Sequence, residues 1–191
     1  MVKILDNVTS KANVKYLEQS LINHPWYYLK GTAYNQLEEN VTPYQPSWVH
    51  FLYSDGESLS DLKPLAETLL LTALDRLNLP ISKLIRVRAG LSTRTPTPIV
   101  HTPHVDWDDN HMSAVYYVND ADGDTVFFKE TRDESLKINS YEWGKDKMFS
   151  IDQTVSPKAD RMVIFNGLTY HASSTPCNVD YRLIINYNWI P

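Results

Sequence analysis

The second half of the chain is built from short apolar segments that are separated by turn-forming residues. The segments are five to nine residues long, and the breaks between them include Asp-Asp-Asn at 108–110 and Ser-Pro-Lys-Ala-Asp at 156–160. Short strands at near-regular spacing are typical of an antiparallel sandwich or barrel and argue against alternating parallel strands and helices. We expect strands over Lys83–Leu91, Ile99–Asp106, His111–Val118, Thr125–Lys129, Met148–Val155, Arg161–Phe165 and Tyr181–Trp189.

The first eighty residues show helical periodicity instead. A first helix is expected to begin at Thr9 or Ser10, which would cap it, and to run to about Asn23, because apolar residues recur there at helical spacing. A second is expected to begin at Ser60, a plausible cap, and to run up to Pro80. Helices followed by strands are the order of an α+β domain whose helices cover one face of a sheet. We therefore predict one mainly β domain over residues 1–191, in which residues 1–80 form a helical and extended buttress and residues 81–191 form the core; short strands are also expected at 26–29 and 47–53.

The last predicted strand has two different faces. Side chains alternate along a strand, so one face of this strand is apolar and suited to pack on helices. The other face points toward a polar environment. This is unusual for an inner strand and predicts that a functional site lies along this face. The apolar face carries Leu183, Ile185, Tyr187 and Trp189, and the other carries Arg182, Ile184, Asn186 and Asn188.

Composition excludes several classes of protein. The hydrophobic content of 42% and charged content of 21% are those of a globular chain and exclude a disordered one. A net charge of −5 without a run of Lys or Arg argues against nucleic acid as a partner. The lone Cys177 favours a reducing compartment, and neither a signal sequence nor a membrane-spanning stretch is visible. We expect a cytoplasmic protein that is not bound to membranes.

Three sequence features could carry chemistry. His104 and Asp106 lie two apart in a predicted strand, so both side chains project to the same side. Together with a second histidine, His171, they would form the two-imidazole, one-carboxylate set that suits non-haem Fe(II). Arg182 follows on the polar face of the last strand, and a guanidinium can bind a carboxylate through two hydrogen bonds. Taken singly, each has an ordinary alternative: a polar pair on a strand, a structural histidine, or a surface ion pair.

The order and spacing of these residues resemble the 2-oxoglutarate/Fe(II)-dependent dioxygenase superfamily, and most closely its small prolyl-4-hydroxylase-like members. The segment Ala-Val-Tyr-Tyr-Val-Asn at 114–119 is similar to the tyrosine-bearing strand that follows His-x-Asp in that family. The segments at 122–128 and 161–165 look like its Gly-x-x-x-Phe strand and the strand before the distal histidine. The resemblance covers about residues 82–190. It departs from the family pattern at Ile184, where Ser or Thr is common.

The resemblance implies a double-stranded β-helix, also called a jelly-roll, with Fe(II) in its mouth. His104, Asp106 and His171 would bind the metal, and Arg182 would hold the distal carboxylate of 2-oxoglutarate. Tyr117 faces inward by alternation and could donate to the same carboxylate, or it could be an ordinary core aromatic. With O₂, such an enzyme couples the conversion of 2-oxoglutarate to succinate with hydroxylation of a substrate, for example peptidyl proline or an amino acid.

Several alternatives stay open at this level. The rival to an enzyme is a non-catalytic, cupin-like jelly-roll that binds a ligand, although cupins typically carry His-x-His, which is absent here. Arg86 and Arg88 could compete with Arg182 for the carboxylate, but such a pair is more often a solvated edge. His101 is interpreted as a surface residue or as a neighbour of the site. The substrate, a small molecule or a peptide, is expected to be selected by the loops at 92–103 and 129–147.

Overall fold

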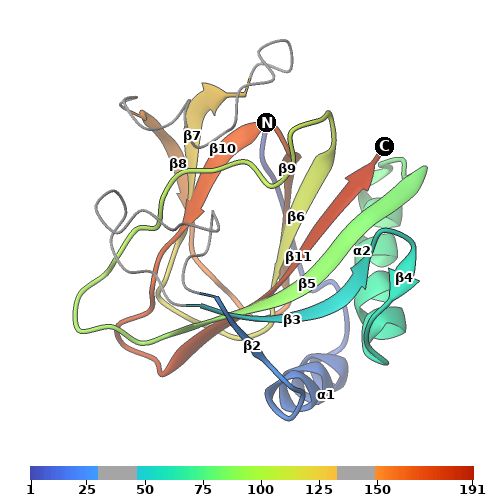
Figure 1. The fold of residues 1–191 in the computed structure, drawn as a ribbon, viewed down its shortest axis with the longest axis horizontal. Coiled ribbons are helices and arrows are strands. Elements are labelled where there is room, and N and C mark those ends of the chain that lie inside the picture. The colour runs from blue at the N-terminus through green and yellow to red at the C-terminus, as the bar shows by residue number, and fades with distance from the viewer. Residues whose placement is uncertain (30–46, 133–148) are drawn as a thin grey trace.

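The structure is a computed structural model that describes residues 1–29, 47–132 and 149–191. In these residues two antiparallel sheets face each other, and both described helices lie on the outer side of the larger sheet (Figure 1). Most of the loop expected at 129–147 lies outside the described residues. Among the described helices, none is long and apolar enough to cross a membrane.

The larger sheet holds the last strand of the chain near its centre. Strand β11 (Tyr181–Ile190) pairs with β5 (Lys83–Thr93) on one side and with β6 (Met112–Tyr117) on the other, so its residues face neighbours from two distant parts of the sequence. The described strands run in the order β1 (Lys3–Asp6), β9 (Arg161–Asn166), β6 (Met112–Tyr117), β11 (Tyr181–Ile190), β5 (Lys83–Thr93), β3 (Ser47–Ser54) and β2 (Tyr27–Leu29), and β4 (Glu57–Ser58) pairs with β3.

The smaller sheet covers the other side of the site. Strand β7 (Thr125–Thr131) lies between β10 (Thr169–Ser173) and β8 (Ile151–Val155). The pairing of β10 with β7 places Ser173 opposite Thr125 and His171 opposite Phe127. The smaller sheet lies across from the larger one (Figure 1), and alternate side chains of β7 and β10, among them Thr125, His171 and Ser173, line the space between the two sheets.

Two helices cover the outer face of the larger sheet. Helix α1 (Lys11–Ile22) begins where predicted, because the Ser10 hydroxyl accepts a hydrogen bond from the backbone N–H of Asn13 at 3.2 Å. Helix α2 (Lys63–Leu77) is also where the periodicity places it, but the prediction of Ser60 as its cap is wrong. The Ser60 hydroxyl lies 2.9 Å from His50 Nε2 instead, and α2 begins without a side-chain cap.

The main core fills the space between these helices and the sheet. The apolar face of β11 packs there, as its alternation predicted, together with the buried leucines of both helices. The Tyr187 hydroxyl donates to the backbone carbonyl of Ala66 in α2 at 2.9 Å, and the indole N–H of Trp189 donates to the carbonyl of Pro80 at 3.2 Å, so the two side-chain polar groups that this face buries are both satisfied. The opposite face of β11 is thereby turned toward the smaller sheet.

One predicted strand is not continuous. Residues 99–106 form only isolated bridges, Val100 to Ser174 and His104 to His171, rather than the strand predicted for Ile99–Asp106. Pro103, inside this segment, explains the difference, because a proline lacks the N–H that a continuous ladder requires. The segment still runs along β10, so His104 is held beside His171.

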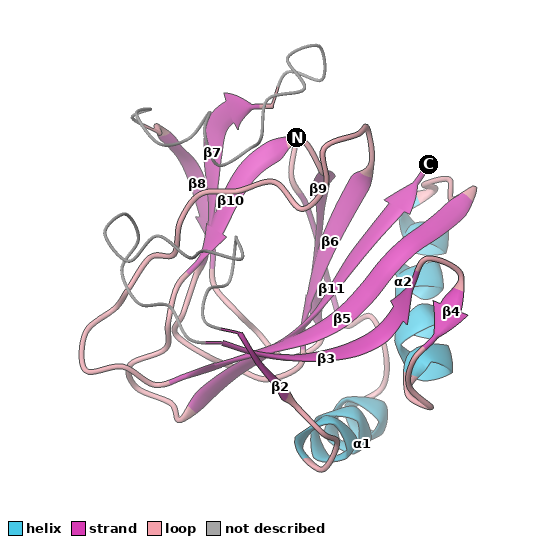
Figure 2. Ribbon diagram, viewed as in Figure 1, coloured by secondary structure: helices cyan, strands magenta, loops and turns pink. Residues whose placement is uncertain are grey.

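The prediction of an α+β, mainly β fold with a jelly-roll core is confirmed (Figure 2). The first eighty residues, expected to act as a buttress, also contribute β1 to β4 to the larger sheet. Strand β1 adds to its edge beside β9, far along the chain. The division of the domain at residue 80 stays a prediction.

Candidate metal centre and anion-binding cavity

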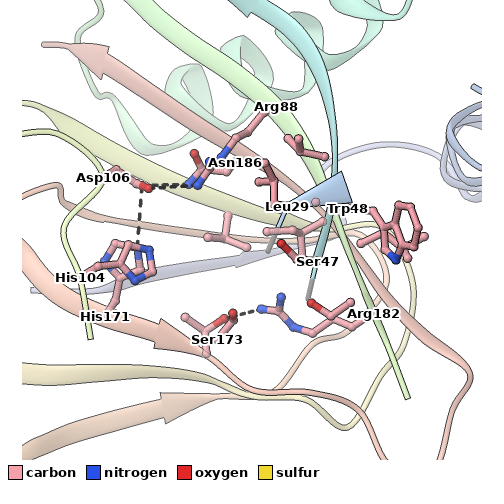
Figure 3. Close-up of a pocket in the computed structure, with 17 residues that line it drawn as sticks. Leu29, Ser47, Trp48, Arg88, His104, Asp106, His171, Ser173, Arg182 and Asn186 are labelled. Carbon is pink, nitrogen blue, oxygen red and sulfur yellow. Dashed lines mark hydrogen bonds and ion pairs between the residues drawn. The ribbon is translucent and has the colours of Figure 1, made fainter. Parts of the chain in front are cut away.

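A cavity lies between the two sheets and is lined by the polar face of β11. Its walls come from β2, β3, β5, β6 and β11 on one side and from β7, β10 and the segment before Trp107 on the other (Figure 3). The lining residues that the site uses are Arg88, His104, Asp106, Thr125, His171, Ser173, Arg182, Ile184 and Asn186. The prediction that this face of the last strand borders a site is consistent with this placement.

His104 and His171 are held side by side by their backbones. The N–H of each residue donates to the carbonyl of the other at 2.9 Å, and their rings lie 4.6 Å apart between centroids. Each Nδ1 lies near the backbone carbonyl two residues earlier, at 3.0 Å for His104 and 3.1 Å for His171. A carbonyl only accepts, so Nδ1 carries the proton and the lone pair resides on Nε2. Both histidines therefore present Nε2 as a ligand atom.

The environment of His104 keeps its ring neutral. Burial disfavours the imidazolium, and the neighbouring His171 ring adds to this effect, so that the pKa of His104 falls to about 3. A neutral imidazole is the form that binds a metal ion. The ring thus has the correct charge state over the whole physiological pH range.

Asp106 sits at the centre of a dense set of hydrogen-bond donors. Its Oδ2 accepts from the side-chain amides of Asn186 and Asn188, both at 3.0 Å, and from the Ser113 hydroxyl at 3.3 Å. Its Oδ1 accepts from Arg86 at 3.2 Å. These contacts fix the orientation of the carboxylate.

The charges around Asp106 keep it ionised although it is buried. Burial alone would raise the pKa of the carboxyl group, but the neighbouring His171, Arg86 and Arg88 hold that pKa well below its usual range. Asp106 is therefore an anionic oxygen ligand beside the two imidazoles.

The structure brings the three residues predicted as metal ligands to one point. One ligand atom from each of His104, Asp106 and His171 lies within 4.8 Å of the others, and His171 Nε2 is 3.8 Å from Asp106 Oδ2. Ligand atoms about 2 Å from one ion lie at most about 4 Å apart, so a bound ion would draw these three atoms slightly closer together. Among the described residues this is the one group of three or more His, Cys, Asp or Glu side chains with such spacing.

Arg182 enters the same cavity from β11, away from the histidines (Figure 3). Arg182 is 2% exposed, and one of its guanidinium nitrogens donates to Thr125 Oγ1 at 2.8 Å. Its Nε has no partner, and within the described parts of the chain no carboxylate lies within 4.0 Å of the guanidinium. A buried charge without a counter-ion is costly, so this arrangement indicates a place for an anionic ligand.

Tyr117 lies beside Arg182 but does not line the cavity. Its ring centroid is 5.5 Å from the Arg182 guanidinium carbon, and its hydroxyl donates to Thr125 Oγ1 at 2.7 Å. Burial raises the pKa of Tyr117, which keeps the phenol protonated as a donor. Direct donation from Tyr117 to a ligand carboxylate stays a prediction, because Thr125 occupies the position between the phenol and the cavity.

Thr125 is a site residue that sequence reasoning missed. Its oxygen accepts from both Tyr117 and Arg182, which uses its two lone pairs, so its own O–H is free to donate to a ligand in the cavity. Thr125 could replace the hydroxyl that Ile184 lacks at the position two residues after Arg182. In the sequence, Thr125 could be placed only on the same face of its strand as Phe127. The pairing of β7 with β10 is what turns that face toward the cavity.

The interpretation of Arg86 and Arg88 as a solvated edge is wrong. Their side chains are only 16% and 22% exposed, and both lie at Asp106. The cause is the pairing of β5 with β11, which places Arg86 opposite Asn188 and Arg88 opposite Asn186. The residues share a face in β5, and that face borders the cavity.

Two other histidines have structural surroundings. His101 is 1% exposed, so it is not a surface residue, and its Nδ1 lies 2.8 Å from the Ser173 hydroxyl. Burial and the charge of Arg182 lower the pKa of His101 to about 4. The His111 ring packs directly on Gly167, so that even a Cβ at that glycine would collide with it. Neither histidine belongs to the ligand group.

Comparison with known proteins identifies the fold. The sequence matches no family model and no curated protein. Among solved structures it is similar to an oxidoreductase of the 2OG-Fe(II) oxygenase family from Burkholderia pseudomallei, with 10% identity, 99% of this chain and 84% of that chain covered, and a TM-score of 0.65.

Two further structures have the same architecture. A prolyl-4-hydroxylase from Pseudomonas putida has 15% identity, covers 100% of this chain and 92% of its own, and gives a TM-score of 0.56. HygX from Streptomyces hygroscopicus, solved with nickel and 2-oxoglutarate bound, has 14% identity, covers 100% of this chain and 82% of its own, and gives a TM-score of 0.59. At these identities the similarity establishes the fold, which is that of the 2-oxoglutarate and Fe(II) oxygenases.

Proposed function

We propose that this chain is an Fe(II)- and 2-oxoglutarate-dependent oxygenase that hydroxylates an amino acid or a prolyl residue of a peptide. The proposal is supported by one observation above all: Arg182, a buried cation without a described counter-ion, opens into the same cavity as the His104, Asp106 and His171 cluster. A metal-ligand set and an anion site in one cavity are what a chelating co-substrate with a distal carboxylate requires.

The donor set fits Fe(II). Two neutral imidazoles and one carboxylate that leave coordination positions open are typical of non-haem iron oxygenases. The backbone carbonyls that fix both imidazoles, and the amides around Asp106, provide the outer contacts that metal ligands usually have. Fe(II) bound here with 2-oxoglutarate would supply the O₂-dependent chemistry that yields succinate, CO₂ and a hydroxylated product.

The protein contributes positioning and charge. Arg182 and the Thr125 hydroxyl would bind the distal carboxylate of 2-oxoglutarate, and Tyr117 keeps both groups in place through Thr125. The two histidines and Asp106 would hold the metal at the other end of the cavity. Ile184 lines the wall between them and, as an apolar side chain, excludes water from it.

A cupin-like binding module is the alternative function. It would explain a metal site but not the buried Arg182, which such a module has no need to keep uncompensated. Formation of succinate from 2-oxoglutarate, even without a substrate, separates the two functions.

The experiment is an anaerobic titration of the purified chain with Fe(II) and 2-oxoglutarate. We expect the weak visible charge-transfer band of the chelate and its loss in His104→Ala and Asp106→Ala. Replacement of His111, which packs on Gly167 outside the ligand group, provides a matched histidine control. Failure of the unaltered protein to bind divalent metal would refute the proposal.

A further inference from the structure

Arg88 is a cation of the cavity that the proposed co-substrate does not use. Arg182 lies opposite Ser92 across the β5–β11 pair, whereas Arg88 lies opposite Asn186. Four residues of extended chain separate these positions, which is about 13 Å along the strands. Arg88 therefore stands at the metal end of the cavity, beside Asp106 and Asn186, and Arg182 at the other end (Figure 3).

The hydrogen bonds of Arg86 and Arg88 differ. Arg86 donates from Nε to Asn188 Oδ1 at 3.0 Å and from a terminal nitrogen to Asp106 at 3.2 Å, and it does not line the cavity. Arg88 approaches Asp106 Oδ1 only at 3.6 Å, makes no side-chain hydrogen bond to the described residues, and does line the cavity. The donors of Arg86 are therefore used in binding Asp106 and Asn188, while the donors of Arg88 stay available to a ligand.

The charge balance around the cavity favours an anion at Arg88. Arg86, Arg88 and Arg182 contribute three positive charges, and Asp106 contributes one negative charge. A divalent metal ion and a co-substrate with two carboxylates add no net charge. An excess of two positive charges therefore persists among these groups, and it favours a carboxylate placed next to Arg88.

Asn186 provides a hydrogen-bond acceptor next to Arg88. Its amide nitrogen donates to Asp106 Oδ2, which settles the orientation of the amide, because a carboxylate oxygen cannot donate in return. Its Oδ1 is buried and has no partner among the residues that the structure describes. Since a buried acceptor without a partner is unfavourable, a ligand that donates an N–H to Asn186 Oδ1 would be bound favourably.

We propose that the substrate is an α-amino acid with a free carboxylate, which Arg88 binds while Asn186 Oδ1 accepts a hydrogen bond from the amino group. The two groups are cross-strand neighbours, and a carboxylate and an amine on one carbon match such a pair. This inference rests on the proposed oxygenase function and narrows it. A prolyl residue inside a peptide offers neither a free carboxylate nor an N–H.

The test measures binding to the holoprotein without turnover. The chain is loaded with Mn(II) and saturating 2-oxoglutarate, and proton relaxation enhancement is recorded for three probes of similar size: alanine, propionate and alaninamide. We expect the strongest enhancement for alanine, a weaker one for propionate, and little for alaninamide. Arg88→Gln should weaken alanine binding at least about tenfold, because charge-assisted hydrogen bonds are lost.

Two further variants separate recognition from folding. Arg88→Lys retains the charge without the planar fork and should bind alanine with intermediate affinity. Arg76→Gln removes an exposed arginine of α2, on the outer side of the larger sheet, where it donates to the backbone carbonyl of Asn7, and it serves as the matched control. Equal enhancement by alanine and alaninamide in the unaltered protein, or undiminished alanine binding in Arg88→Gln, overturns the inference. Failure to form the Mn(II) and 2-oxoglutarate complex overturns the proposed function, and this inference with it.

Discussion

Replacement of Arg182 by glutamine tests the role of the buried guanidinium. The substitution removes a cation that is 2% exposed and that has no carboxylate partner among the described residues. Loss of one partner from a buried, hydrogen-bonded charge pair costs about 2–5 kcal/mol. We therefore expect the Kd for 2-oxoglutarate to rise by roughly 30- to 5,000-fold.

The assay is titration of 2-oxoglutarate into the anaerobic Fe(II) protein, followed through its visible band. Arg182→Lys, which keeps the charge but not the fork, should lose less affinity. Thr125→Val should weaken binding about tenfold, because one donor to the ligand is lost. Metal affinity should not change, since neither residue belongs to the ligand group. A Kd for Arg182→Gln within threefold of the unaltered protein would refute the assignment.

Arg182→Gln is expected to weaken 2-oxoglutarate binding but not to reduce the stability of the ligand-free protein. An uncompensated buried charge destabilises the folded state, so Arg182→Gln should not lower the free energy of unfolding without 2-oxoglutarate. Thermal unfolding with and without the co-substrate measures both quantities. A large loss of stability in the ligand-free variant would mean that Arg182 has a structural role instead.

Other parts of the fold give three further predictions. Arg161 holds the pKa of Asp6 at about 2, below its ordinary value of 3.8, so the pair stabilises the fold above about pH 4 and this contribution is lost as the pH falls toward 2. Since the Asp6 side chain is 32% exposed, Asp6→Asn should cost only about 1 kcal/mol at pH 7 and nothing near pH 2 in urea unfolding. Gly167→Ala should destabilise the fold by about 1–3 kcal/mol and shift the His111 ring resonances, because the added Cβ collides with that ring. Tyr187→Phe should cost about 0.5–1.5 kcal/mol, because the hydrogen bond to the Ala66 carbonyl is lost while that carbonyl keeps its donor within α2; unchanged stability in either buried variant would contradict the packing described.

Local periodicity was enough to predict most elements. The helical spacing that predicted α1 and α2, and the alternation in β11, depend only on neighbours a few residues apart, so they survive in the folded chain. Where the prediction was wrong, another partner intervened. Residues 99–106 are not a continuous strand because of Pro103, and Ser60 contacts His50 instead of capping α2.

The candidate site was only partly visible in the sequence. His104 and Asp106 could be paired because residues two apart in extended chain share a side, and Arg182 could be placed by alternation. Thr125 could not be found in this way, and Arg88 was considered as a competitor of Arg182 but was interpreted as part of a solvated edge. Thr125 belongs to the site because β7 faces β11 across the cavity, and Arg88 because β5 pairs with β11.

The sequence by itself determined which residue types lie on which face of each strand and helix, because that depends on short-range geometry. Only the tertiary structure decided which faces meet. Arg182 contacts a threonine 57 positions away, and Asp106 contacts two asparagines that lie 80 and 82 positions away. Such contacts depend on strand register, and register is set by the packing of the whole sheet rather than by any local pattern.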